Sequence, residues 1–209
     1  MVPVVMIGGA LLEFAAWWAV SRKAISIWVA MGIALPALGI AAIAVREPSL
    51  SPSVSAGVAV AAGATAGLAL YLATRVFVAA VRPWRTFQRQ SVELYARRAG
   101  LPLIVAIVLA AVVMAPGEEL FWRGLVQAKL SIVFDGRTAG AAIAWAVFAL
   151  VNLPSRNLAI IAGAVVGGAV WSALSWWTGG ALASIVCHVL WTALMLGFPV
   201  VRVPVGGRA

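Results

Sequence analysis

Long apolar runs dominate this chain, and they fix the kind of fold that it can adopt. A transmembrane helix needs about 20 consecutive, mostly apolar residues to cross the hydrocarbon core of a bilayer. Several runs reach or exceed that length, and only 10% of all residues are charged, against about 25% in a typical soluble domain. The sequence therefore predicts an all-α, polytopic transmembrane helical bundle. Its apolar runs are 3–20, 24–45, 54–81, 101–115, 138–153, 157–174 and 179–200, and a further helical stretch of mixed polarity covers 118–133.

The number of spans depends on residues 101–133, which contain Pro116 and Gly117. One crossing helix over this segment gives seven spans, whereas a helix that breaks at the proline gives eight. We prefer seven, because that arrangement gives the stronger charge bias between the two faces. No basic region precedes the first apolar run, so we expect no cleaved signal peptide and take residues 3–20 as the first span.

The positive charge of the chain gathers in its predicted loops. A net charge of +9 could indicate a nucleic-acid partner, but the positive-inside rule explains basic residues in short loops between spans, so we expect none. With seven spans, the loops of one face hold only Arg46 and Arg137, and ten basic residues lie on the other face. This bias places the N-terminus outside and the C-terminus in the cytoplasm, and the composition suggests a bacterial inner (plasma) membrane. The ten are Arg22, Lys23, Arg82, Arg85, Arg89, Arg97, Arg98, Arg156, Arg202 and Arg208.

Residues 82–98 are predicted to form an interfacial amphipathic helix. Trp84, Phe87, Leu94 and Tyr95 fall near one helical face, and the arginines lie largely off it. Such a helix lies on anionic lipid, either as a membrane anchor or as an element that recruits substrate. Elsewhere, small residues recur at four-residue spacing, which lets helices approach closely. They are Gly63 and Gly67, and Ala159, Gly163 and Gly167.

The segment APGEELFWRG at 115–124 places three ionisable side chains within an apolar stretch. A charge at bilayer depth costs at least about 3 kcal/mol, so each needs a reason. On an α-helix, Glu119 and Arg123 lie four residues apart on one face and can neutralise each other. Glu118 is rotated from Glu119 by about 100° and has no partner close in sequence. It suits a general base or acid; the alternative is a buried ion network that ties helices together.

Two more predicted spans carry polar side chains. The segment FALVN places Phe148 and Asn152 one turn apart, and SIVCHVLWT places Ser184, His188 and Thr192 on one stripe. His188 is the only histidine in the chain. By itself, a lone histidine in a membrane helix is either a hydrogen-bonding partner of another helix or a catalytic group.

The positions of these groups along their helices bear on whether they meet. If the turn near Asp135 joins two antiparallel helices, Glu118 and Asn152 each lie roughly 25 Å from it. We therefore expect both at one depth, nearer the cytoplasmic side, whereas the mid-span position of His188 fits that depth less well. Outside this region, Glu13 and Arg75 are expected to form a structural ion pair at the inner side.

In this order, the segments EELFWRG, FALVN and CHVLWT resemble the CPBP family of CAAX prenyl proteases and bacteriocin-processing intramembrane proteases, also called abortive-infection proteins. That family carries Glu-Glu-x-x-x-Arg, then Phe-x-x-x-His, then His followed four residues later by Asn or Asp, on successive membrane helices. The resemblance covers about residues 100–200. We divide the chain into N-terminal transmembrane helices with the basic helix (1–98), a CPBP-like protease core (99–201) and a short tail (202–209).

The resemblance implies a role for each matching residue. Glu118 would activate the attacking water, and Glu119 and Arg123 would organise the site. His188 matches the third-motif histidine, which positions water or stabilises the oxyanion, and Phe148 matches the phenylalanine of the second motif.

The chain departs from the family pattern at two positions. Asn152 stands where the family has its second-motif histidine, and it can orient a water molecule but cannot accept a proton. Thr192 stands where the family has Asn or Asp, and its hydroxyl still donates a hydrogen bond. We assign catalytic roles to Glu118, His188 and Asn152, supported by Glu119, Arg123, Phe148 and Thr192.

Two hypotheses follow for function. The chain is an intramembrane endopeptidase that uses glutamate-activated water on a peptide or lipidated protein substrate, or it is an inactive scaffold or immunity-type partner of the same fold. A third class, a small transporter, would need broken helices around a midplane site. No cofactor is expected, and one histidine, two glutamates and the distant Cys187 fall short of usual zinc ligation. Expected partners are the substrate, membrane lipids and a possible membrane protein.

Overall fold

The computed structural model describes residues 1–45, 49, 52–97 and 100–201. Helices make up most of this part of the chain, and it contains no strand, so the all-α prediction is confirmed. The predicted tail at 202–209 lies outside the described residues, as do four of the loop arginines counted above, Arg46, Arg98, Arg202 and Arg208.

The helices follow the apolar runs closely. In chain order they are α1 (Val2–Ser21), α2 (Ile27–Ala44), α3 (Ala56–Ala80), α4 (Arg85–Ala96), α5 (Leu103–Ile107), the π-helical η1 (Val108–Met114), α6 (Ala115–Glu119), the π-helical η2 (Leu120–Gln127), α7 (Ala128–Val133), α8 (Arg137–Asn152), the short 3₁₀ turn η3 (Leu153–Ser155), α9 (Leu158–Ala162), the π-helical η4 (Gly163–Gly167), α10 (Gly168–Thr178) and α11 (Leu182–Gly197).

Within the described residues, six helical segments are long and apolar enough to cross a membrane, and α11 is a shorter apolar helix. One of the six, Leu103–Val133, joins α5 to α7 in a single helix of 31 residues. It continues through Pro116, as the one-crossing interpretation of this segment requires. The total of seven or eight spans stays a prediction.

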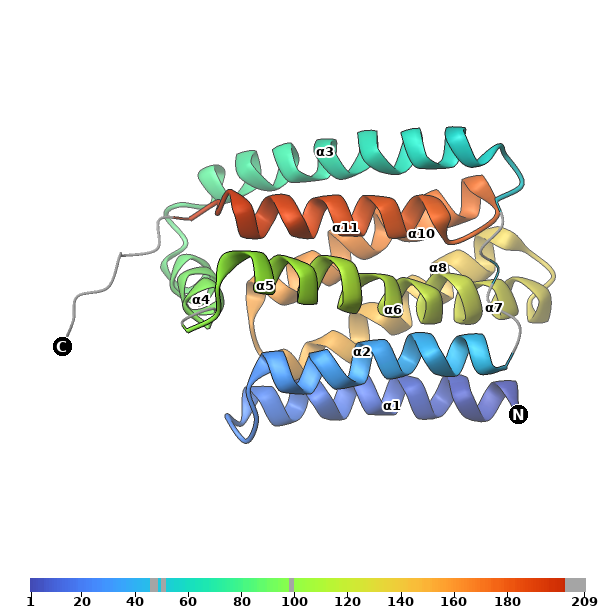
Figure 1. Cartoon of the computed structure of the whole chain (residues 1–209), viewed down its shortest axis with the longest axis horizontal. Helices are drawn as coiled ribbons and strands as arrows, with labels where there is room; N and C mark the ends of the chain where they lie inside the picture. Colours follow the sequence, from blue (N-terminus) through green and yellow to red (C-terminus); the bar gives the residue numbers. More distant parts are fainter. Residues whose placement is uncertain (46–48, 50–51, 98–99, 202–209) are drawn as a thin grey trace.

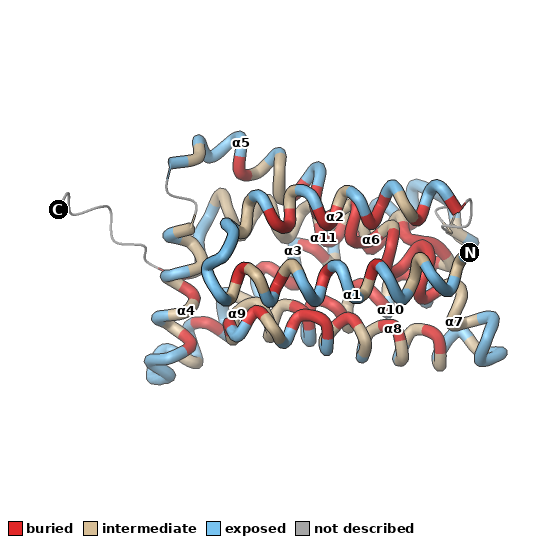
Figure 2. The backbone as a smooth tube through the Cα atoms, turned by 90° about the horizontal axis from the view of Figure 1, so that it is seen from below, coloured by how far each residue is buried: buried red, intermediate tan, exposed pale blue. Residues whose placement is uncertain are grey.

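The outer surface of the bundle is apolar, as a lipid environment requires. Ile33, Ile40 and Val76 are 67%, 68% and 70% exposed, and exposed positions follow the outer sides of the helices while buried ones gather inside (Figure 2). A soluble monomer rarely exposes apolar side chains on this scale. The chain is therefore an integral membrane protein.

Successive long helices run in opposite directions, so the bundle has two ends (Figure 1). α4 lies at the end where α1, α3 and α11 finish and α9 begins, and the turn between α7 and α8 lies at the other end. Arg22, Arg82 and Arg156 follow or precede these elements and belong to the α4 end, whereas Arg137 begins α8 at the opposite end. The predicted separation of charge is thus present among the described residues, and the orientation in a membrane stays a prediction.

Glycines of α3 bring α11 very close, as their spacing predicts. A Cβ atom on Gly67 would lie 2.9 Å from the backbone oxygen of Cys187, and one on Gly63 would clash with the backbone oxygen of Ala183. Only hydrogen fits at these positions. This contact fixes the part of α11 that carries His188.

Gly117 has the same role between α6 and α2. A Cβ atom at Gly117 would clash with the backbone oxygen of Leu35, and one at Gly39 would lie 2.7 Å from Cα of Gly117. The Pro116–Gly117 pair therefore marks a close helix–helix contact and not a helix break. It anchors the turn that carries Glu118 and Glu119.

α4 forms the predicted amphipathic helix, but much of its apolar face contacts protein. Phe87 is buried and meets Phe77 of α3 edge-on at a centroid distance of 5.4 Å. Tyr95 is half-buried, and its burial raises the pKa of the phenol to about 12. Trp84 and Arg89 remain exposed. Contact between α4 and lipid is therefore expected chiefly on the exposed side of this helix.

Candidate active site

The candidate site lies where α1, α6, α8 and α11 meet inside the bundle. Glu118 and Glu119 end α6, Arg123 follows in η2, Asn152 ends α8, and His188 lies within α11. All five side chains are buried. The three polar segments on separate helices thus converge, including His188, whose depth fitted least well in the sequence.

Glu119 and Arg123 form the expected ion pair. Nη1 of Arg123 donates to Oε1 of Glu119 at 3.1 Å, and both side chains are almost fully buried. Nη2 of Arg123 donates to the backbone oxygen of Gly168 at 3.1 Å, and the guanidinium lies 4.4 Å from the ring centroid of Phe148. The buried charge is therefore matched by an acid, a carbonyl and an aromatic face.

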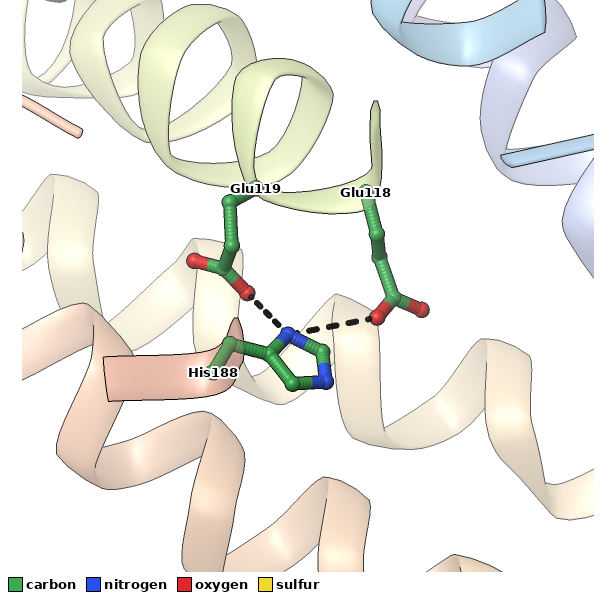
Figure 3. Close-up of side chains that lie close together, drawn as sticks. All are labelled: Glu118, Glu119 and His188. Carbon is green, nitrogen blue, oxygen red and sulfur yellow. Dashed lines mark hydrogen bonds and ion pairs between the residues drawn. The ribbon is translucent and has the colours of Figure 1, made fainter. Parts of the chain in front are cut away.

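His188 is held between the glutamates and an aromatic ring. Its Nδ1 lies 3.0 Å from Oε1 of Glu119 and 3.7 Å from Oε2 of Glu118 (Figure 3). Its ring stacks on Trp171 at a centroid distance of 3.7 Å and an interplanar angle of 15°. Glu119, the ionised partner of Arg123, is only an acceptor, so Nδ1 carries the proton in this contact.

The second nitrogen of His188 is therefore the one available for chemistry. Nε2 lies on the far side of the ring from Glu119 (Figure 3), and His188 lines a cavity. In a neutral imidazole whose Nδ1 is protonated, Nε2 accepts hydrogen bonds. Holding a water molecule fits this tautomer, whereas donation to an oxyanion requires the imidazolium.

Glu118 is not isolated, contrary to its lack of a partner in the sequence. Besides His188, its carboxyl group lies beside that of Glu13, within reach of a side-chain hydrogen bond. A hydrogen bond between two carboxyl groups requires one proton, because an ionised carboxylate only accepts. Glu118 also lines the cavity, so one side of its carboxyl group faces open space.

The expected Glu13–Arg75 ion pair is wrong. Glu13 is fully buried; Oε2 accepts from Nε1 of Trp122 at 2.7 Å, and Oε1 accepts from Nδ2 of Asn152 at 3.3 Å. Arg75 is exposed on α3, with its guanidinium 5.9 Å from the ring centroid of Tyr71. Glu13 faces the bundle interior, where its helix contacts the acidic motif, and so it joins the site.

The other predicted residues surround the same space. Nδ2 of Asn152 also donates to the backbone oxygen of Phe148 at 2.9 Å, so its amide is fixed at the end of α8. Asn152, Phe148 and Thr192 all line the cavity. Ser184, one turn before His188, is buried, and its hydroxyl donates to the backbone oxygen of Ala181.

The cavity has a volume of about 470 Å³, and most of its wall is apolar. At one side it is lined by Glu118, Asn152 and His188, and at another by residues of α4, among them Phe87 and Tyr95. It therefore extends from Glu118 to the end of the bundle that carries α4. A mainly apolar space of this kind, with a few fixed polar groups, is typical of a ligand site.

Glu118, Glu119 and His188 each offer a ligand atom, and these atoms lie within 4.8 Å of one another. However, Oε1 of Glu119 already contacts Arg123 and His188, and the guanidinium charge opposes a cation at that oxygen. Zn²⁺ binds histidine through a ring nitrogen that carries no proton, whereas Nδ1 of His188, the nitrogen that faces both glutamates, carries one in its contact with Glu119. This donor set does not suit a metal ion; that the protein uses none stays a prediction.

Sequence reasoning missed three residues of the site, Glu13, Trp122 and Trp171. Glu13 was recognisable as an acid within the first apolar run, and Trp122 as a buried donor inside the acidic motif. Trp171 stacks on His188 from a helix without any motif. Its part in the site follows only from how α10 packs against α11.

A helical membrane bundle with glutamates, an arginine and a histidine buried beside an apolar cavity defines the class: a polytopic membrane protein with an intramembrane polar site. Within the chain, residues 100–194 match the family model described as type II CAAX prenyl endopeptidase Rce1-like. This match covers a little under half of the chain and confirms the resemblance to the CPBP family. It includes every residue proposed from the three motifs and excludes Glu13. No curated protein and no solved structure shows a significant match.

Proposed function

We propose that this protein is an intramembrane endopeptidase that hydrolyses a peptide bond with water activated by Glu118. The observation that carries the proposal is the position of Glu118, buried yet on the wall of the large cavity and 3.7 Å from His188. A general base must reach both the water and the substrate. The match of residues 100–194 to a protease family supports the same conclusion.

In the proposed reaction, a water molecule lies between Glu118 and Nε2 of His188. Glu118 takes one proton from the water, and the water oxygen attacks the carbonyl carbon of the peptide bond. The tetrahedral intermediate collapses as Glu118 returns that proton to the leaving nitrogen. Glu119 and Arg123 hold the imidazole in place, and the hydroxyl of Thr192 is a donor for the oxyanion.

The substrate we propose is a membrane-associated peptide that carries a long apolar group, such as a prenyl chain. The cavity wall is mainly apolar and reaches from α4 to Glu118, so it can hold an alkyl chain while the peptide lies at the acid. The predicted charge bias puts the α4 end on the cytoplasmic side. We place the protein in the plasma membrane of a bacterium.

The test compares peptides in membranes that contain the wild type, Glu118→Gln or Glu93→Gln, at matched expression, by quantitative mass spectrometry of peptide termini. Glu93 is an exposed acid on α4 that pairs with Arg89, so this variant controls for the loss of a carboxylate. We expect new termini with the wild type and Glu93→Gln, and none with Glu118→Gln.

A second candidate is an inactive scaffold or immunity-type partner with the same fold. It is favoured by one observation: asparagine at position 152 cannot take a proton, and its amide is already bound to Glu13 and Phe148. Identical termini with all three proteins, each equally well folded, would contradict the protease and support the scaffold.

A further inference from the structure

Glu13 lies on α1, outside the segment that matches the Rce1-like family, and yet it reaches the acidic motif. It is fully buried. An acid inside a membrane helix is costly and is by default associated with function. Glu13 forms no ion pair with Arg75, which is exposed on α3, so that pair cannot explain its burial.

The neighbours of Glu13 connect it to the acidic motif and to the end of α8. Trp122 in η2 donates at 2.7 Å, and Asn152 at the end of α8 donates at 3.3 Å, each to a different oxygen of the carboxyl group. Trp122 follows Glu118 by four residues, and Asn152 lines the cavity together with Glu118, so both donors hold Glu13 beside the carboxyl group of Glu118. Both oxygens of the Glu13 carboxyl group are therefore held by donors from other helices, next to Glu118.

We propose that Glu13 is a positioning residue that holds one proton between its carboxyl group and that of Glu118. The proposal rests on the hydrolysis proposed above. Two adjacent buried carboxylates repel each other strongly, so a shared proton stabilises the pair and fixes the direction of the Glu118 side chain. Glu118 lines the cavity and Glu13 does not. Glu118 therefore meets the water, and Glu13 acts through it.

The shared proton stays within the pair during the reaction. Glu118 uses its cavity-facing oxygen to take one proton from the water and returns the same proton to the leaving nitrogen, so no proton is gained or lost overall. Asn152 stands where the family has a histidine and cannot hold a proton, but its amide holds Glu13. In this chain, α1 supplies the proton-holding group that α8 lacks.

The test uses the full chain in lipid nanodiscs, as wild type, Glu13→Gln, Glu118→Gln and the control Glu93→Gln. The probe is an internally quenched peptide with a farnesyl thioether on its cysteine, for which kcat and KM are measured together with the thermal unfolding midpoint. Infrared spectra of the same samples report the C=O stretching band of protonated carboxyl groups.

We expect Glu13→Gln to lower kcat at least tenfold, with KM and the unfolding midpoint close to wild type. Glu13→Gln and Glu118→Gln should each remove or shift the protonated-carboxyl band, and Glu93→Gln should not. If Glu13→Gln folds poorly, Trp122→Phe removes the 2.7 Å donor to Glu13 but keeps an aromatic ring, and a smaller fall in kcat is expected.

Three results would overturn the proposal while leaving the hydrolysis intact. They are wild-type kcat in Glu13→Gln, a fall in kcat that merely follows a fall in the unfolding midpoint, and a carboxyl band that does not respond to Glu13→Gln. If the wild type shows no cleavage that depends on Glu118, the hydrolysis itself fails, and the positioning role fails with it.

Discussion

At the scale of single residues, two adjacent glutamates have different surroundings. Glu119 binds Arg123 and His188, so its negative charge is balanced inside the protein. Glu118 meets Glu13 and the cavity. Because they are rotated by about 100° on the helix, Glu119 faces Arg123 and His188, whereas Glu118 faces the cavity.

Replacing Arg123 should show how much its ion pair with Glu119 contributes to stability. Arg123→Met leaves the Glu119 carboxylate buried without its cation, which costs about 3–5 kcal/mol of unfolding free energy. Arg89→Met is the matched control, because Arg89 pairs with Glu93 at the same four-residue spacing but at the surface, where such pairs contribute about 0.3–0.5 kcal/mol. Thermal unfolding in detergent measures both, and equal losses would contradict the assignment.

The predictions at this scale succeeded where the partners were close in sequence. The Glu119–Arg123 pair follows from four-residue spacing on one helix. Glu13 was paired with the wrong residue, because its partners Trp122 and Asn152 lie 109 and 139 positions away. Those contacts depend on which face of α1 turns inward, and a helix that is apolar on every side gives no periodic pattern from which to predict this.

At the scale of helices, glycine controls the position of the site residues. The α3–α11 contact passes through Gly63 and Gly67, and the same stretch of α11 holds His188. The α2–α6 contact passes through Gly39 and Gly117, next to Glu118. Each side of the site thus depends on a helix pair that approaches to backbone distance.

A methyl group at one of these glycines should separate the helices. Gly63→Ala would clash with the backbone of Ala183, whereas Gly57→Ala on the same helix meets nothing within 4 Å. Both gain helix propensity, but overpacking at Gly63 costs about 1–3 kcal/mol. We expect a lower unfolding midpoint and weaker cleavage for Gly63→Ala only. Identical behaviour of the two variants would mean that the α3–α11 contact is not tight.

The long helices were predictable, since each follows an apolar run, but their internal geometry was not. Leu103–Val133 form one helix with π-helical segments on both sides of α6. A π-helical turn adds a residue relative to an α-helix and often occurs at functional sites. No residue pattern specifies it, so the directions of side chains beyond one turn could not be predicted from a uniform 100° rotation.

At the scale of the whole molecule, the cavity links α4 to the acids. Its wall includes residues from the predicted N-terminal part (1–98) and from the predicted core (99–201). Since its size depends on the packing of all these helices together, neither its volume nor its apolar lining could be predicted from the sequence. A long apolar group of a substrate should therefore contribute to binding there.

Filling the cavity should weaken the use of lipidated substrates. Ala73 and Ala69 lie one turn apart on α3 and are both exposed, but only Ala73 lines the cavity. A tryptophan at position 73 brings about 150–250 Å² of side-chain surface into this space. For Ala73→Trp we expect kcat/KM on a farnesylated peptide to fall about tenfold, equivalent to about 1.4 kcal/mol. Ala69→Trp should match the wild type; a similar fall in both variants would assign the effect to the outer surface.

The orientation of the bundle decides which compartment the cavity faces. Arg22, Arg82 and Arg156 lie at the α4 end and Arg137 at the other, so the α4 end should face the cytoplasm.

A single introduced cysteine can show on which side of the membrane each end of the bundle lies, because the native Cys187 is buried. Arg89 on α4 and Val133 at the end of α7 are both exposed. In sealed right-side-out vesicles, a membrane-impermeant thiol reagent should label Val133→Cys and not Arg89→Cys, and inverted vesicles should give the opposite result. The reverse pattern would place the α4 end and its cavity outside, where no prenylated cytoplasmic protein could reach Glu118.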